Sequence, residues 1–394
     1  MSSLMGSRKR RPHPCRFLPI VVLLCAAIYI GSAYIVTDYQ QKLSLWDISG
    51  FLRKTRSPMC EDDSRPCGTE ALPKGIIAST SDLEMRPLWG SIPKKKSSRE
   101  INLLALAVGI KQKANVNRIV KKFLSSNFVV MLFHYDGNVN GWTDVEWSSR
   151  AIHASAVNQT KWWFAKRFLH PDIVHEYSFI FLWDEDLGVQ NFDVRRYLSI
   201  IKKEGLEISQ PALDPDTSEV HHPLTARKRG SVVHRSINQQ LRHGKRCDEH
   251  STGPPCSGMV EMMAPVFSRA SWRCTWNMIQ NDLVHAWGVD FQLGYCVQGD
   301  PTKKIGIVDS EYVVHYGLPT LGGSPENETN TEDHTGAAPK TVSMNLLRRG
   351  ESAHESKERD AVRKQAYTDL ERFKHRWRKA VAEDKSWADR YRHT

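Results

Sequence analysis

Hydrophobic residues between positions 101 and 323 gather into short runs, and the segments between these runs have helical spacing. The first run covers 103–108, a helical pattern follows over 117–123, and a second run covers 128–135. A strand–helix–strand unit of this length predicts two parallel strands joined by a right-handed crossover. The chain therefore begins its folded part as an α/β domain.

The same alternation continues along the chain. The pattern predicts helices over 162–174, 187–204 and 269–279, and strands over 179–183, 206–210, 259–267, 305–309 and 312–317. Pro211 is expected to end the strand over 206–210, and residues 214–256, polar and aperiodic, to form a functional loop. A charged amphipathic helix is expected over 357–382, within a polar C-terminal region that spans 324–394. The fold class predicted for 101–323 is α/β, with a mixed, mainly parallel central sheet flanked by helices.

Three acidic residues directly follow the apolar run 179–183. Asp184, Glu185 and Asp186 would lie at the carboxyl end of a buried strand, where open α/β sheets bind their ligands. Adjacent carboxylates repel one another, and a divalent cation with oxygen ligands relieves that repulsion. Asp184 and Asp186 are expected to face the metal and Glu185 to turn away. The alternative is an acidic turn that caps the next element.

Two later residues extend this hypothesis. His315 ends a predicted strand, and a neutral imidazole beside two carboxylates and a diphosphate suits manganese. Its alternative is a histidine hydrogen-bonded in the core. Asp290 follows Trp287 at the expected start of a helix, where the helix dipole would keep it ionised and able to take a proton from an acceptor hydroxyl. Its alternative is simple helix capping.

The N-terminal segment indicates the cellular compartment. Residues 17–36 carry no charge and are long enough, as a helix, to cross a bilayer core of roughly 30 Å. Five basic residues and no acids in 1–16 predict a cytosolic tail and a lumenal remainder, with 37–100 as a stem. This tail accounts for +5 of the formal net charge of +11, and a lumenal address argues against nucleic-acid binding. A cleaved signal peptide is the alternative, and it gives the same compartment.

Cysteines and sequons agree with a lumenal address. Six of the eight cysteines lie beyond the predicted membrane segment. We expect the nearest-neighbour pairs 60–67, 247–256 and 274–296, although six cysteines allow fifteen pairings, and zinc is the competing interpretation. Asn158 and Asn327 head the two N-glycosylation triplets, of which the second, in a polar loop, is the stronger candidate.

These features together resemble nucleotide-sugar glycosyltransferases of the GT-A type. That resemblance implies an Asp-x-Asp metal motif after a central strand (Asp184 and Asp186), a metal-binding histidine on a late strand (His315) and an acceptor-side acid in a W-G-x-D-like segment (Asp290). It also implies a nucleotide-sugar donor, a glycan acceptor, and manganese as the divalent metal. The short tail, single anchor and stem resemble the layout of Golgi glycosyltransferases, which are single-pass type II membrane proteins.

A second resemblance is closer in amino-acid sequence and covers most of residues 71–323. Stretches at 84–90, 133–138, 161–168, 181–189, 208–215 and 285–290 resemble a plant family that carries domain of unknown function 707. The family is often labelled as lysine-ketoglutarate reductase trans-splicing related, but it has no settled activity. A dinucleotide fold requires glycines at G-x-G-x-x-G spacing after its first strand, whereas only Gly109 follows 103–108. A dehydrogenase is therefore disfavoured.

Two functions of different class remain open from the sequence. The first is a manganese-dependent glycosyltransferase in the Golgi lumen, anchored through residues 17–36. The second is a non-catalytic Golgi protein with the same fold that binds glycans or scaffolds other enzymes. Homo- or hetero-oligomers are compatible with either function, and the three acids at one strand end favour the enzyme.

Overall fold

The computed structural model describes residues 68–77, 100–235, 237, 247, 251–318 and 353–391. No helix in these ranges is long and apolar enough to cross a membrane. The predicted anchor over 17–36, the 60–67 cysteine pair and the sequon at Asn327 lie outside the described residues. Asn158, which heads the other sequon, is exposed.

A single mixed sheet forms the centre of the described chain. Its strand order is β3-β2-β1-β4-β8-β6-β9-β5, with β7 paired to β9. The strands are β1 (Ile101–Val108), β2 (Phe128–His134), β3 (Ile152–Ser155), β4 (Tyr177–Trp183), β5 (Leu187–Gly188), β6 (Ile208–Leu213), β7 (Val233–His234), β8 (Val266–Ser268) and β9 (Ile305–His315). Strands β3, β2, β1 and β4 are parallel, and β8 runs antiparallel between β4 and β6. The predicted mixed α/β sheet is confirmed.

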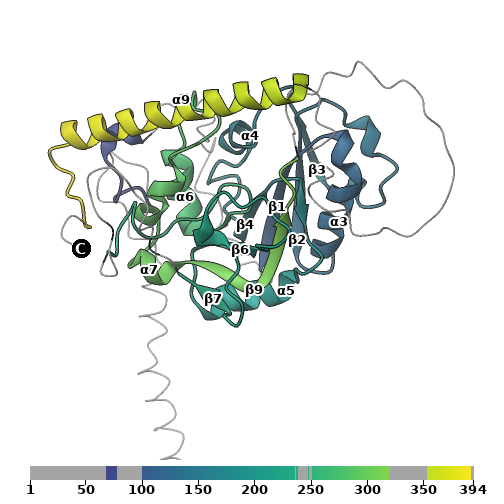
Figure 1. Ribbon diagram of the computed structural model, residues 1–394, viewed down its shortest axis with the longest axis horizontal. Helices are drawn as coiled ribbons and strands as arrows, with labels where there is room; N and C mark the ends of the chain where they lie inside the picture. Colours follow the sequence, from purple (N-terminus) through teal and green to yellow (C-terminus); the bar gives the residue numbers. More distant parts are fainter. Residues whose placement is uncertain are drawn as a thin grey trace, which may run out of the picture. The chain divides into compact units, whose positions relative to one another are not determined.

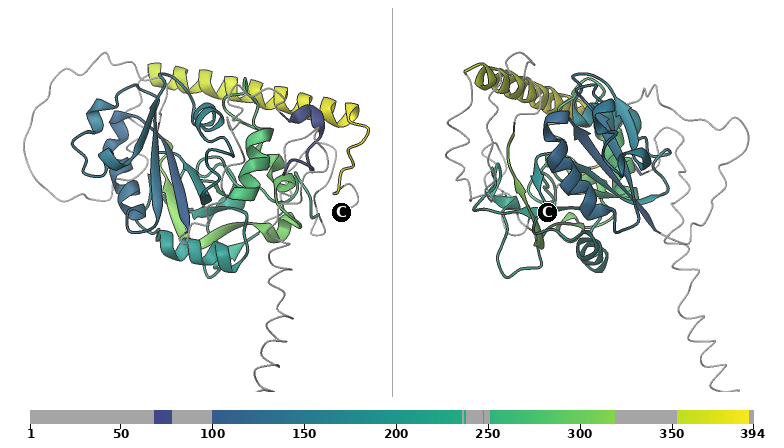
Figure 2. Two further views of the ribbon diagram at one scale, coloured as in Figure 1. Left: turned by 180° about the vertical axis from the view of Figure 1, so that it is seen from behind. Right: turned by 90° about the vertical axis from the view of Figure 1, so that its right-hand side faces the viewer.

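Helices cover both faces of this sheet (Figures 1 and 2). The helices are α3 (Lys113–Phe123), α4 (Lys161–Phe168), α5 (Val194–Lys203), α6 (Arg269–Met278), α7 (Pro301–Lys304) and α9 (Ala353–Glu383). The short 3₁₀ segments are η2 (Lys74–Ile76), η3 (Ile110–Gln112), η4 (Asn140–Trp142), η5 (Ser148–Arg150), η6 (Pro223–Thr225) and η7 (Asp290–Cys296).

Alternate residues of each central strand enter two separate cores. Leu103 of β1 packs in the core that contains α4 and α6, whereas Leu104 packs in the core that contains α3 and α5. Ile180 and Phe181 of β4 divide in the same way. Because both faces are covered, these strands are apolar throughout, which is why their sequence shows runs rather than alternation.

Several predicted boundaries were wrong for local physical reasons. Pro211 does not end β6: the strand continues to Leu213, and its register with β9 shifts directly after the proline, which has no N–H to donate. The helix expected from 187 starts at Val194, because the Asp193 side chain accepts hydrogen bonds from the first-turn amides. The helix expected over 162–174 is shorter, since α4 ends at Phe168.

The strands expected over 259–267 and 305–317 also differ from the observed ones. Of the residues in 259–268, only 266–268 form a strand, β8. The residues before β8 form a loop that crosses the end of β4, and Asp184 N, directly after β4, donates to Met263 O in this loop at 2.8 Å. The two late strands are one continuous strand, β9. This loop brings residues 259–265 to the edge of the sheet where the acids lie.

The C-terminal helix packs on the domain and runs along it in Figures 1 and 2. Phe373 and Ala380 are buried in the α4–α6 core. Residues 68–77, which fall within the predicted stem, pack there as well: Leu72 and Ile76 are fully buried, and Trp387 Nε1 donates to Ala71 O at 3.0 Å. Segments from both ends of the described chain thus complete one core.

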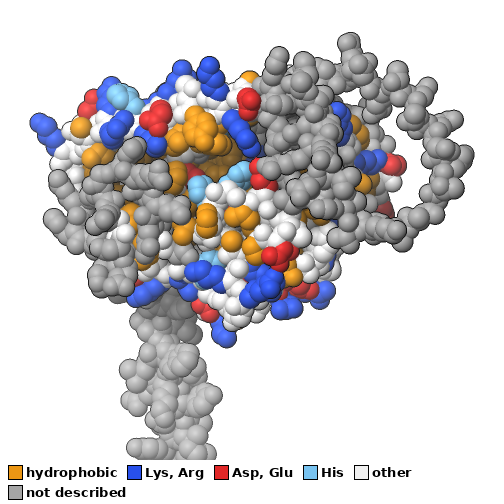
Figure 3. All heavy atoms as spheres, in the orientation of Figure 1, with side chains coloured by type: hydrophobic (Ala, Val, Ile, Leu, Met, Phe, Trp, Pro, Cys, Tyr) orange, Lys and Arg blue, Asp and Glu red, His pale blue; other side chains and the backbone are white. Residues whose placement is uncertain are grey.

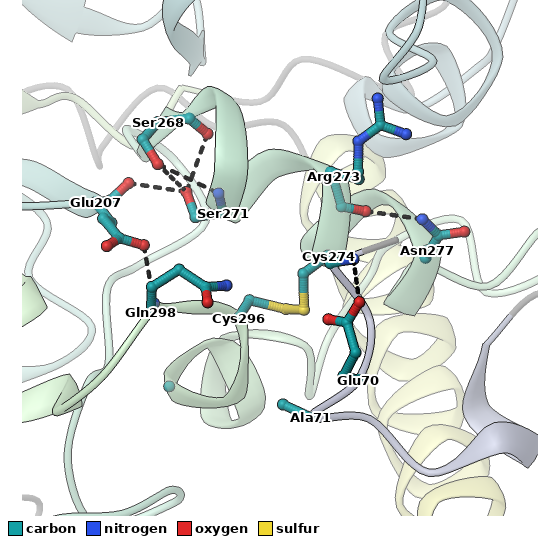
Figure 4. The surroundings of a disulfide bond; sticks show 12 residues. Glu70, Ala71, Glu207, Ser268, Ser271, Arg273, Cys274, Asn277, Cys296 and Gln298 are labelled. Carbon is teal, nitrogen blue, oxygen red and sulfur yellow. Dashed lines mark hydrogen bonds between the residues drawn. A yellow bond between two sulfur atoms is a disulfide. The ribbon is translucent and has the colours of Figure 1, made fainter. Parts of the chain in front are cut away.

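Both of the expected disulfides that fall within the described residues are present. Cys247 bonds to Cys256, and Cys274 bonds to Cys296. The second bond joins α6 to η7, and Glu70 from the N-terminal segment lies beside it (Figure 4). This disulfide therefore fixes the end of η7, the segment that begins at Asp290, to α6.

Removing the Cys274–Cys296 bond is expected to destabilise the protein more than removing the Cys247–Cys256 bond. The two bonds span 22 and 9 residues, and the unfolded chain gains more freedom when the longer loop is opened. Urea unfolding of the C274A/C296A variant should show a loss of about 2–4 kcal/mol. An equal or larger loss in C247A/C256A would contradict this expectation.

Candidate functional site

The candidate site lies at the carboxyl ends of β1 and β4, where the order of the strands in the sheet reverses. Strand β1 has β2 on one side and β4 on the other, so the crossovers from it diverge at this point. Open α/β sheets bind ligands outside the carboxyl ends of strands at such a switch point. Gly109 follows β1 there, and Asp184 to Asp186 follow β4.

Glu185 points into the sheet end and holds the loop in place. Its carboxylate accepts a hydrogen bond from Gly109 N at 2.7 Å and another from the Tyr135 hydroxyl. Asn115 Nδ2 donates to the Glu185 carbonyl at 2.6 Å. Burial raises the pKa of Glu185 to about 8. The loop after β4 is thereby fixed to β1 and α3, and its neighbours are held at the sheet edge.

Asp186 and His315 come together from different strand ends. Leu187, the first residue of β5, pairs with His315 at the end of β9, and Asp186 Oδ2 lies 3.5 Å from His315 Nε2. Leu318 N also donates to Asp186 Oδ2 at 3.0 Å. Burial raises the pKa of the Asp186 carboxyl, and the nearby His315 opposes this shift. Two of the three predicted metal ligands are therefore neighbours.

Asp184 faces a buried lysine. Lys161 Nζ lies 2.7 Å from Asp184 Oδ1 and donates to Met262 O at 2.6 Å. Only 7% of the Lys161 side chain is exposed, and burial lowers the pKa of its ammonium group. This cation was missed by the sequence analysis, because a lysine at the start of a predicted helix is most often solvated. The Lys161 ammonium group balances the negative charge of Asp184, the most exposed of the three acids.

Asp290 begins η7 and differs from expectation in its electrostatics. Its Oδ1 accepts hydrogen bonds from Gly288 N and Phe291 N, both at 3.1 Å. Burial nevertheless raises the pKa of Asp290 to about 6, and these amides only reduce the shift. The expected helix dipole does not dominate, because η7 is a 3₁₀ segment of seven residues. A carboxylate with this pKa is ionised at neutral pH yet basic enough to accept a proton.

Glu261 is a buried acid that interacts electrostatically with residues on both sides of the site. It is 4% exposed, accepts a hydrogen bond from the Thr225 hydroxyl, and interacts electrostatically with both His315 and Asp290. Burial is the largest cause that raises the pKa of Glu261 to about 7; Asp290 adds to the rise, whereas the Thr225 hydrogen bond and His315 oppose it. The sequence predicts a strand over 259–267 but no role for Glu261. The signal available was one acid within an otherwise apolar run.

Glu261 is expected to make stability depend on pH. Its folded pKa, about 7, exceeds the ordinary value of 4.5, so the folded state holds a proton that the unfolded state releases between these values. Stability should thus fall as pH rises from about 4.5 to 7, by up to roughly 3 kcal/mol. In Glu261→Gln, chemical unfolding across this range should show a fall that is smaller by this amount, while the contributions of Asp290 and Glu185, whose pKa values are also raised, remain. The exposed Glu371→Gln control should show the same fall as the wild type.

The donor set suits a partly built metal site. In the described residues, no group of three or more His, Cys, Asp or Glu side chains is arranged to hold a metal ion. Asp186 and His315 nevertheless offer oxygen and nitrogen atoms at one point. Divalent cations at phosphate-transfer sites commonly take one or two carboxylates from the protein and the remaining ligands from substrate phosphates and water. The residues present fit such a cation, with Asp184 engaged by Lys161.

Comparison with known proteins establishes the family. Residues 63–383 match the family described as "Protein of unknown function (DUF707)", and the chain belongs to this family. The described site residues, Asp184 to Asp186, Asp290 and His315, all lie within the match. No curated protein matches the chain.

Solved structures show only weak likeness. The crystal structure of TarS 1–349 from S. aureus shares 9% identity and a TM-score of 0.31 over 55% of this chain, and the match covers 60% of that fragment. HddC from Yersinia pseudotuberculosis shares 9% identity and a TM-score of 0.29, over 56% of this chain and 95% of that one. Likeness this weak does not assign a function to this chain.

Proposed function

We propose that this protein transfers a sugar from a nucleotide-sugar donor to a glycan acceptor, assisted by a divalent metal such as manganese. The observation that carries the proposal is the meeting of Asp186 and His315, 3.5 Å apart, at the switch point of the sheet. A diphosphate at this point would lie against a site built for a hard cation.

Each residue has a distinct part in the proposed reaction. Asp184, Asp186 and His315 would hold the metal, and Glu185 would keep their loop in position through Gly109 and Tyr135. A bound divalent cation supplies positive charge for the leaving diphosphate. Asp290 takes the proton from the acceptor hydroxyl, which its pKa of about 6 permits at neutral pH.

The location proposed for this activity is the Golgi lumen. The support is the uncharged segment 17–36 preceded by basic residues, together with the two disulfides, which form in oxidising compartments. The protein would be a single-pass type II membrane protein whose described domain is lumenal.

Donor binding is tested by thermal stabilisation of the full-length chain. With manganese present, one member of a panel of UDP- and GDP-sugars should raise Tm by several degrees. The shift should disappear without metal and in Asp186→Asn, but persist in Asp216→Asn, a control in which the changed residue pairs with Arg229 on the surface. No shift with any donor would contradict the enzyme.

One observation favours the alternative of a non-catalytic glycan-binding or scaffold protein. Lys161 already neutralises Asp184, so part of the charge that a metal would balance is balanced by the protein. In a scaffold, the Lys161–Asp184 pair would be purely structural. Failure of the donor test in a folded protein would move the assignment to this alternative.

A further inference from the structure

Two exposed aromatic side chains, one on the loop that leads to Asp290 and one on α9, lie against each other. Trp287 is 36% exposed and Tyr367, on α9, is 60% exposed. Their ring centroids are 5.1 Å apart, with the ring planes at 76°. A solvent-facing pair of large aromatic rings from two separate elements is unusual, because such rings normally gain stability by burial.

The loop that carries Trp287 has a demanding backbone. Ala286 adopts φ 54°, which non-glycine residues rarely do, and Gly288 adopts φ 96°. A Cβ at Gly288 would lie 2.8 Å from Phe373 and 2.9 Å from Leu370, so α9 packs directly on this glycine. The loop buries Ala286 and Val289 while Trp287 between them faces outward. Strain of this kind is typical of ligand-binding positions.

Helix α9 is fastened to the same loop by polar contacts. His285 Nδ1 lies 2.7 Å from Asp369 Oδ2, and Asp369 is 1% exposed. Two turns further on, Arg376 pairs with both carboxylate oxygens of Asp282 at 2.6 Å. Tyr367 is therefore held at a fixed place relative to Trp287, and little conformational entropy remains to be lost on binding.

The loop that carries Trp287 connects to the predicted reaction centre at two points. Trp287 precedes Asp290 by three residues, and Thr160, which directly precedes Lys161, donates its hydroxyl hydrogen bond to Val284 O in the same loop. Figure 3 shows hydrophobic side chains gathered below α9, with histidine side chains next to them on the same face. Trp287 and Asp290 thus share one loop, and Thr160 joins this loop to the Lys161–Asp184 pair.

We propose that Trp287 and Tyr367 form an acceptor platform that binds a pyranose ring of the acceptor glycan; this inference rests on the proposed function. The C–H groups on one face of a pyranose are weakly positive and pack on the negative face of an aromatic ring, while the sugar hydroxyls stay in water. Two rings of different orientation match one sugar and its neighbour. The acceptor hydroxyl is then presented to Asp290.

The platform is tested by ¹⁹F NMR on the full-length chain labelled with 5-fluorotryptophan. The Trp287 resonance is assigned by its loss in Trp287→Phe. The probes are tetrasaccharides of β-linked glucose, xylose, galactose and mannose, and of α-linked galacturonic acid. At least one should shift the Trp287 resonance, with affinity lowered about 10-fold in Tyr367→Ala and retained in Tyr367→Phe. Val362→Ala, at an exposed position on α9, should bind as the wild type does.

The outcomes separate this inference from the proposed function. If donor binding succeeds but no tetrasaccharide shifts Trp287, or Tyr367→Ala has no effect, the platform is overturned and the transferase stands. If a tetrasaccharide binds with the expected dependence on Tyr367 while no donor binds, the platform stands as a glycan-binding site. The transferase is then overturned.

Discussion

Replacing Asp290 with Asn is expected to lower the rate of sugar transfer by roughly 10²–10⁴-fold, the usual contribution of a general base. Donor binding should be unchanged, because Asp290 lies on the acceptor side of the proposed site. The amide keeps the shape and can keep the hydrogen bonds from Gly288 and Phe291, so folding should be retained. The measurement is transfer rate and donor-dependent Tm in parallel, with Asp216→Asn as control.

The pH profile gives a second readout of the same role. Burial raises the pKa of Asp290 to about 6, and a base acts only when ionised. Wild-type transfer should therefore decline as pH falls below about 6, and the residual rate of Asp290→Asn should lack this decline. A variant with full activity, or with an unchanged acid limb, would show that another group accepts the proton.

Replacing Phe373 with Ala is expected to cost roughly 3–5 kcal/mol in the free energy of unfolding. Phe373 is 2% exposed and packs on Gly288, in the loop that carries Trp287 and leads to Asp290. Val362→Ala on the same helix, at a 37% exposed position, should change stability by less than about 0.5 kcal/mol. Urea unfolding checks both values.

The Phe373 result decides whether α9 is part of the domain. If the two variants behave alike, the helix is dispensable and Tyr367 cannot form a fixed part of the acceptor platform. The large loss expected for Phe373→Ala would instead show that a segment near the end of the chain stabilises the loop next to the site.

Much of the central sheet followed from local pattern. Strands β1, β2 and β4 are buried on both faces, so their sequences are apolar runs that stand out from the amphipathic helices α3 and α5. The position of Asp184 to Asp186 after such a run placed them at a strand end. His315 was found in the same way, at the end of β9.

The remaining features depend on contacts between distant residues. Lys161 is 23 positions from Asp184, and nothing local indicates that its ammonium group is buried. Glu261 acquires its raised pKa from burial produced by packing, with Thr225 and His315 nearby. Residues 259–265 have strand-like composition, but the chain crosses the end of β4 there, so tertiary structure overrides propensity.

The Lys161–Asp184 pair bears on how a metal would bind. For Asp184 to join Asp186 and His315 as a ligand, its carboxylate must share or leave the lysine ammonium. Asp186 and His315 are already adjacent, so they provide the first protein ligands in the proposed site. His315 is the one nitrogen donor among the three proposed ligands, so its bond to the metal can be distinguished from the carboxylate bonds.

Pulsed EPR of manganese bound to the full-length chain, with UDP and GDP as probes, tests whether His315 is a metal ligand. With the preferred nucleotide, we expect ³¹P coupling from the diphosphate and ¹⁴N coupling from one imidazole. In His315→Gln, the nitrogen coupling should vanish, and the phosphorus coupling should remain in whatever fraction still binds. Absence of bound manganese with both nucleotides, or a nitrogen coupling that survives His315→Gln, would show that Asp186 and His315 do not form the proposed metal site.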